Sequence, residues 1–237
     1  RPHIIGAYNI LEANYSPVPF FMSTRGYGIF LHTPYTSHWD MGHSTPDVYS
    51  FEAEGGELDY YFMAGADFPS LLDQYTAVTG KSPLLPKPAH GLHVGTYSGG
   101  TWGYEKHTST DYVVNLGRTF REKEIPVDII HLDSTWRMFG EQGGSGATTF
   151  EWRETFDDPE AMFDQLYDMG YSMVGVHVRP RYDNGRQYKL LDQARDAGMV
   201  YPEPNNTGEF VNFFDPDAVD WWWEHGAMKV ASQGAMF

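Results

Sequence analysis

Several features are missing from this chain, and each absence excludes a class of protein. The 237 residues contain no cysteine, so disulfides and thiolate metal sites are excluded and the redox compartment is left open. No apolar run approaches the roughly 20 residues that a membrane-spanning helix needs. Cations are scarce, with 16 Lys and Arg against 32 Asp and Glu and a net charge of −16. Without a basic cluster to neutralise phosphates, a nucleic-acid partner is excluded.

The residues that are present describe a folded protein with many rings. Hydrophobic residues make up 41% and aromatic residues 16%, including seven Trp and sixteen Tyr. This is the composition of a globular chain, and the rings would suit stacking against sugars. No signal peptide opens the chain and Arg1 is not an initiator methionine. We therefore expect the natural N-terminus to lie upstream, and localisation is left open.

The first part of the chain carries strand and turn signals. Residues 1 to about 65 show no sustained helical period and predict part of a β-sandwich. Two extended runs, Ser50–Glu54 and Leu58–Met63, flank a Gly-Gly pair and predict a hairpin. The stretch Phe68–Thr79 has helical spacing and ends at Gly80. Three prolines follow within six residues, so the predicted domains are residues 1–82 and 83–237.

After the prolines, strands and helices alternate. Strands are predicted at 91–94, 127–132 and 171–178, and helices at 109–123, from 157, at 188–197 and from 215. This order predicts either a doubly wound sheet or a (β/α)8 barrel. A barrel needs about 250 residues, so a chain with roughly 150 left after the prolines holds an open sheet or half a barrel.

The run Val127–Trp136 (VDIIHLDSTW) ends a buried strand on a charge. Its apolar, β-branched residues predict a strand of a parallel sheet, and Asp133 follows at the carboxyl end. A carboxylate, two hydroxyls and an indole at that position suit a polyhydroxylated ligand. The alternative from these ten residues alone is that Asp133 only caps a loop.

Six motifs lie in order along the chain, at residues 19–28, 58–61, 75–80, 130–133, 150–159 and 214–218. Together they resemble the motifs of glycoside hydrolase family 31, the retaining α-glycosidases. At the corresponding positions the family typically has VPFxxSSRGYGxF, DYYxxxG, YxxLTG, a second barrel strand ending in Asp, FxWDxxxFPDP and DFTNPxA. The resemblance implies the first half of a (β/α)8 barrel preceded by part of an N-terminal β-sandwich domain.

The resemblance also places the catalytic carboxylates. In this family an Asp nucleophile ends the fourth barrel strand and the general acid follows later. Gly234–Phe237 resembles the approach to the nucleophile, which is expected roughly three residues beyond Phe237. The chain is therefore expected to contain neither catalytic carboxylate, to be inactive alone, and to be completed by the rest of the same polypeptide.

The strand-end residues within this chain are expected to form the wall of the sugar-binding subsite. Asp133 matches the family's sugar-binding Asp, and a carboxylate can accept charge-assisted bonds from adjacent hydroxyls. His177 and Arg179 depart from the family pattern, which has Trp or an aliphatic residue and then Asn or Asp at these positions. The predicted substrate-binding residues are Asp133, Ser134, Thr135, Trp152, His177, Arg179 and Tyr97.

The expected partner is an oligosaccharide or other α-glycoside, of glucose, xylose or galactose. The resemblance implies no metal and no organic cofactor, and a homo-oligomer is left open. Two alternatives remain beside the hydrolase: a non-catalytic sugar-binding homologue of the same fold, and an open α/β binding protein with an accessory β domain.

Overall fold

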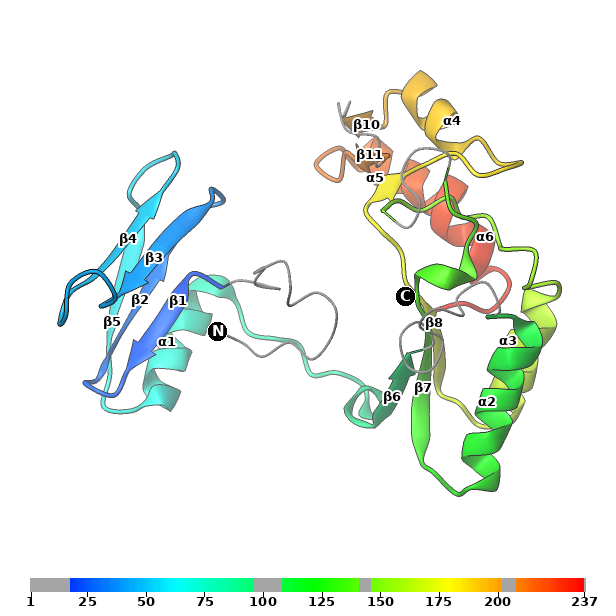
Figure 1. Cartoon of the computed structure of the whole chain (residues 1–237), viewed down its shortest axis with the longest axis horizontal. Coiled ribbons are helices and arrows are strands. Elements are labelled where there is room, and N and C mark those ends of the chain that lie inside the picture. The colour runs from blue at the N-terminus through cyan, green and yellow to red at the C-terminus, as the bar shows by residue number, and fades with distance from the viewer. Residues whose placement is uncertain (1–17, 96–107, 141–145, 202–207, 237) are drawn as a thin grey trace. The chain divides into compact units, whose positions relative to one another are not determined.

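The computed structural model describes residues 18–95, 108–140, 146–201 and 208–236 (Figure 1). The chain divides into two compact units, Arg1–Leu84 and Leu85–Phe237, each of which is considered by itself. This division lies close to the boundary predicted after residue 82. In the described residues, no helix combines the length and apolar character that crossing a membrane requires.

The first unit is an antiparallel β structure with one helix. Strands β1 (Phe20–Ser23), β2 (Tyr27–Leu31) and β5 (Tyr60–Ala64) form one sheet, and β3 (Ser37–Met41) pairs with β4 (Tyr49–Ala53). Helix α1 (Phe68–Thr79) packs on the sheet through the buried side chains of Phe30, Met63 and Leu71. Its N-cap is Asp67, whose carboxylate accepts from the Ser70 N–H in a capping box, and it ends at Gly80 with φ of 92°.

The predicted hairpin around the Gly-Gly pair is wrong. Strand β4 pairs with the preceding strand β3, with Trp39 opposite Phe51, whereas β5 pairs with β2. The two glycines do not form a two-residue hairpin turn, because the runs on either side of them pair with other strands. The ring of Tyr35 lies against both glycines, 2.9 Å from where either Cβ would be. Sequence proximity favoured the wrong neighbour, since both runs have the alternating pattern of a strand.

The second unit is built on a parallel sheet. Strands β6 (Leu92–Gly95), β7 (Val127–Leu132) and β8 (Met173–Val176) lie in that order. Helices α2 (Thr110–Glu122) and α3 (Pro159–Asp168) lie along one side of it (Figure 1). Their N-caps are Ser109 and Asp158, close to the predicted starts of these helices at residues 109 and 157. The βα order predicted for this region is thereby confirmed.

Smaller elements precede, interrupt and follow the parallel sheet along the chain. Strands β9 (Arg181–Tyr182), β11 (Glu209–Val211) and β10 (Val200–Tyr201) form a short antiparallel sheet that was not predicted. The remaining elements are the short 3-10 turns η2 (Lys87–His90) and η4 (Ser134–Trp136), the helices α4 (Leu190–Asp196), α5 (Pro216–Trp222) and α6 (Met228–Ala231), and the π-helical turn η5 (Trp223–Ala227).

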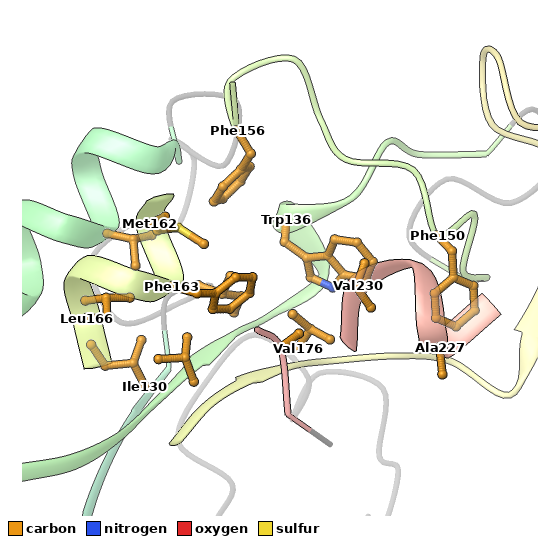
Figure 2. Close-up of a cluster of buried hydrophobic side chains, with 14 of the residues drawn as sticks. Ile130, Trp136, Phe150, Phe156, Met162, Phe163, Leu166, Val176, Ala227 and Val230 are labelled. Carbon is orange, nitrogen blue, oxygen red and sulfur yellow. The ribbon is translucent and has the colours of Figure 1, made fainter. Parts of the chain in front are cut away.

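The two faces of the parallel sheet differ in chemistry. Side chains alternate between faces along a strand. The helix-covered face carries Val94, Ile130, Leu132, Val174 and Val176, which belong to one buried cluster with the helices (Figure 2). The opposite face carries His93, Ile129 and His131, and it continues past the end of β7 to Asp133.

Candidate functional site

Asp133 lies directly after β7 and performs the capping role that the sequence left open. Its Oδ1 accepts from the Ser134 N–H at 2.5 Å and from the Ser134 hydroxyl at 2.9 Å, and so it begins the turn η4. Its side chain is 40% exposed. Within the part of the chain that the structure describes, Asp133 Oδ2 has no recorded hydrogen-bond partner. One oxygen therefore holds the turn while the other can accept from a ligand hydroxyl.

His177 stands next to Asp133 at the end of β8. Its backbone N–H donates to the Leu132 carbonyl at 2.8 Å, and its Nδ1 lies 3.6 Å from Asp133 Oδ1. Burial lowers the pKa of His177, the cations Arg179 and Arg137 lower it further, and Asp133 opposes them. The lowered pKa favours the neutral ring, which offers one N–H donor and one nitrogen acceptor.

Ser134 and Thr135 are buried in the turn. The Ser134 hydroxyl lies between the two site residues, 2.9 Å from Asp133 Oδ1 and 3.4 Å from His177 Nδ1. Thr135 is fully buried, with a hydroxyl that has no hydrogen-bond partner among the described residues. Ser134 thus takes part in the site through Asp133, and the predicted contact between Thr135 and a ligand stays a prediction.

Arg179 is exposed two residues beyond His177, and its backbone is fixed. Its N–H donates to Thr148 Oγ1 at 2.6 Å, and the Thr148 hydroxyl lies 3.2 Å from its carbonyl oxygen. The structure therefore brings Asp133, Ser134, His177 and Arg179 to one edge of the sheet. Tyr97, the remaining residue predicted near strand ends, lies outside the described residues.

Trp152 lies among aromatic side chains. Its ring is 4.8 Å from that of Trp136 and 5.4 Å from that of Phe156, measured between centroids. Its indole N–H donates to Gln233 Oε1 at 2.7 Å. Trp152 was predicted to be a wall of the sugar pocket. In the structure its one polar atom, the indole nitrogen, is bonded to the protein itself, and contact of the ring with a ligand stays a prediction.

Arg137 is a residue of this site that the sequence analysis did not select. It is fully buried, donating from Nε to the Ala147 carbonyl at 2.9 Å and from Nη1 to the Ser134 carbonyl at 3.0 Å. Burial and then the charge of Arg179 lower its pKa to about 10, so it stays a cation at pH 7. A charged residue directly after the buried Trp136 was the signal that could have found it.

His93 and His131 are two further residues near the site that were not predicted from the sequence. They lie on neighbouring strands with 3.2 Å between His131 Nε2 and His93 Nδ1. Burial lowers the pKa of His131, the neighbouring His93 lowers it further, and Asp133 opposes them. The signal was the spacing of His131 and Asp133, two residues apart on a strand and hence on one face.

The site is suited to recognition by hydrogen bonds. It presents an open carboxylate oxygen, a neutral imidazole and an exposed guanidinium at the carboxyl edge of parallel strands, the usual place for ligands in such folds. Among the described residues, no group of three or more His, Asp or Glu side chains is arranged to hold a metal ion.

Comparison with known proteins agrees with the predicted resemblance. The chain is 29% identical over 222 residues to the α-xylosidase XylQ of Lactiplantibacillus pentosus, covering 89% of this chain and 27% of the relative. It is 32% identical over 223 residues to α-glucosidase 2 of Bacillus thermoamyloliquefaciens, covering 89% and 26%. The chain thus spans about a quarter of the length of these relatives.

A solved structure shows the same fold. The dextranase of Flavobacterium johnsoniae complexed with glucose superposes with a TM-score of 0.73 at 30% identity, covering 94% of this chain and 27% of that one. The family model described as the glycosyl hydrolases family 31 TIM-barrel domain matches residues 82–236. The predicted family and the predicted partial barrel with its preceding β domain are confirmed: this chain belongs to glycosyl hydrolase family 31.

Proposed function

We propose that this chain is the sugar-binding part of an α-glycosidase that cleaves terminal α-linked sugars with retention. The observation that carries the proposal is Asp133, which follows the second strand of a family 31 barrel and keeps Oδ2 open. Its relatives include an α-xylosidase and an α-glucosidase, so α-xylosides and α-glucosides are the first substrates to test. An α-galactoside belongs in the same panel.

The catalytic carboxylates are proposed to come from outside this chain. A retaining glycosidase needs two carboxyl groups about 5–5.5 Å apart, one as nucleophile and one as acid and base. The chain spans about a quarter of the length of its relatives, and the parallel sheet of the described residues has three full strands where a closed barrel has eight. Further strands of the same polypeptide would close the barrel and supply both groups.

In that mechanism the residues described here bind and orient the sugar. Asp133 Oδ2 would accept from a ring hydroxyl, and the charge of the carboxylate strengthens such a bond. The neutral His177 would direct a second hydroxyl from the neighbouring strand, and Arg179 would lie at the rim. No metal or organic cofactor is needed for these roles.

The test is release of p-nitrophenol from the α-xyloside, α-glucoside and α-galactoside by the full-length protein. We expect activity on at least one of the three, and none from residues 1–237 alone. Sugar binding by calorimetry without any hydrolysis would favour the non-catalytic homologue instead. A full-length protein that shows no sugar binding and no hydrolysis would refute the proposed function.

A further inference from the structure

The segment after α6 begins a fourth parallel strand. The Met236 N–H donates to the Val174 carbonyl at 3.0 Å, and the Val176 N–H donates to the Met236 carbonyl at 3.3 Å. Met236 thereby pairs with Gly175 in the parallel sense. The sheet thus extends beyond β8, and the backbone from Gln233 to Met236 determines where that strand starts.

Two aromatic side chains hold this segment. The Trp152 indole N–H donates to Gln233 Oε1 at 2.7 Å, and the Tyr167 hydroxyl donates to the Gly234 carbonyl at 2.5 Å. Gly234 has φ of 115°, and a Cβ there would lie 2.8 Å from Cβ of Phe163. The close approach and the positive φ both require glycine, so the turn into the strand is tightly constrained.

The same aromatic cluster also holds the end of β8. Trp136 is fully buried against Trp152, and its indole N–H donates to the His177 carbonyl at 2.8 Å. Figure 2 shows Trp136, Phe163 and Val176 facing one another between β7, α3 and α6. One packed cluster therefore joins the turn after β7, the site residue after β8 and the start of the next strand.

We propose that Trp152 and Tyr167 are positioning residues, which act through Gln233 and Gly234 to set the place of the fourth strand relative to Asp133 and His177. This inference rests on the proposed function, together with the expectation from the family resemblance that the nucleophile ends the fourth strand. In this role both side chains act through the backbone of the fourth strand and not through contact with the sugar. Their effect is on geometry, and in an active site a misplacement of about 1 Å can cost about 100-fold in rate.

A matched pair of Tyr→Phe substitutions tests the inference in the full-length protein. Tyr167→Phe removes the bond to Gly234, and Tyr171→Phe removes an equivalent buried bond of 2.8 Å from its hydroxyl to the Gly117 carbonyl. Each should lower the melting temperature by a few degrees. Only Tyr167→Phe should lower kcat, by about tenfold and with KM nearly unchanged. Equal effects on kcat, or none, would overturn the inference.

The indole bond is tested by substitutions at both of its ends. Trp152→Phe keeps a ring but loses the donor, and Gln233→Leu loses the acceptor, so each should lower kcat by a similar factor. The double variant should be no worse than either single one, because both remove the same bond. Gln233→Glu keeps an oxygen acceptor and should restore most of kcat. Additive losses, or no rescue, would contradict the assignment.

A second measurement does not depend on catalysis. Hydrogen exchange should be faster at the Ala235 and Met236 amides in Tyr167→Phe and Trp152→Phe than in the wild type, and unchanged in Tyr171→Phe. If the wild type hydrolyses no α-glycoside while exchange follows this pattern, the proposed function fails and the positioning role stands. If the wild type is active and exchange is unaffected, the positioning role fails alone.

Discussion

The two faces of the β6–β7–β8 sheet are opposites, although they alternate along the same three strands. The helix-covered face is a continuous apolar layer, with Ile130, Leu132 and Val174 fully buried. The other face carries a histidine pair and continues to Asp133. The first face stabilises the unit by removing apolar area from water, whereas the second provides polar groups at the carboxyl edge.

This division shows which substitutions should affect folding and which should affect ligand binding. On the covered face, the loss of stability caused by a substitution depends on the side-chain volume removed and is large. On the other face, charge and hydrogen-bond direction dominate, and substitutions there can change recognition while leaving the fold intact.

The largest effect is expected from Ile130→Ala on the covered face. Ile130 is fully buried between the sheet and the helices, so the substitution should lower the free energy of unfolding by about 2–5 kcal/mol. Urea denaturation of the full-length protein measures it. Val78→Ala on α1, where the side chain is 45% exposed, is the control, with an expected change within about 0.5 kcal/mol. A loss at Ile130 no larger than at Val78 would contradict the buried layer.

Asp133→Asn should have the next largest effect, and it should act on recognition. Asparagine preserves the shape and can still cap η4, but it removes the charge that strengthens bonds from sugar hydroxyls. We expect kcat/KM to fall about 100-fold, with a change in unfolding free energy below about 1 kcal/mol. Asp158→Asn makes the same change at the N-cap of α3, where the carboxylate accepts from the Ala161 N–H, and it should leave kcat/KM unaltered.

The covered face was predictable from the sequence and the site was predictable only in part. Apolar β-branched runs and capping residues such as Ser109 and Asp158 are local signals, and they located the three parallel strands and helices α2, α3, α4 and α5 of the second unit. Asp133 was found because it ends such a run. The His93–His131 pair was missed because it forms between two strands that are distant in the chain. Arg137 was missed because its burial depends on the fold, although its carbonyl partners Ser134 and Ala147 are near in sequence. The wrong hairpin has the same cause, since partner choice in a sheet is not local.

Substitutions on the two faces of the sheet should differ in how they change the pH dependence of stability. The pKa of His131 is lowered in the folded state, chiefly by burial and then by His93, with Asp133 acting in the opposite sense. The unfolded chain therefore binds more protons, and the free energy of unfolding should decrease as pH falls through about 6.5 toward the lowered pKa. Denaturation at pH 7.5 and pH 5.5 should show a smaller decrease in His131→Gln than in the wild type.

Val174→Ala on the covered face provides the contrast. It should lower stability by a similar amount at both pH values, because it removes volume and no titrating group. A pH-dependent loss in Val174→Ala, or an unchanged pH dependence in His131→Gln, would show that the acid sensitivity arises elsewhere.

The smallest effect is expected from Ser134→Ala, and it is the sharpest test of how the site is built. The Ser134 hydroxyl donates to Asp133 Oδ1 at 2.9 Å and lies 3.4 Å from His177 Nδ1, while the Ser134 N–H holds the same carboxylate oxygen. Losing one of two donors should leave Asp133 in place but less restricted, and kcat/KM should fall by about three- to tenfold, consistent with one hydrogen bond of about 1 kcal/mol.

Ser172→Ala is the matched control for this variant. Ser172 precedes β8 at the opposite end of the sheet, where its backbone N–H donates to the Asp128 carbonyl. Residues at the amino ends of barrel strands contribute to stability and those at the carboxyl ends to the site, so Ser172→Ala should not alter kcat/KM. If the two variants behaved alike, the hydroxyl of Ser134 would have no role in orienting Asp133, and the backbone N–H alone would account for the position of its carboxylate.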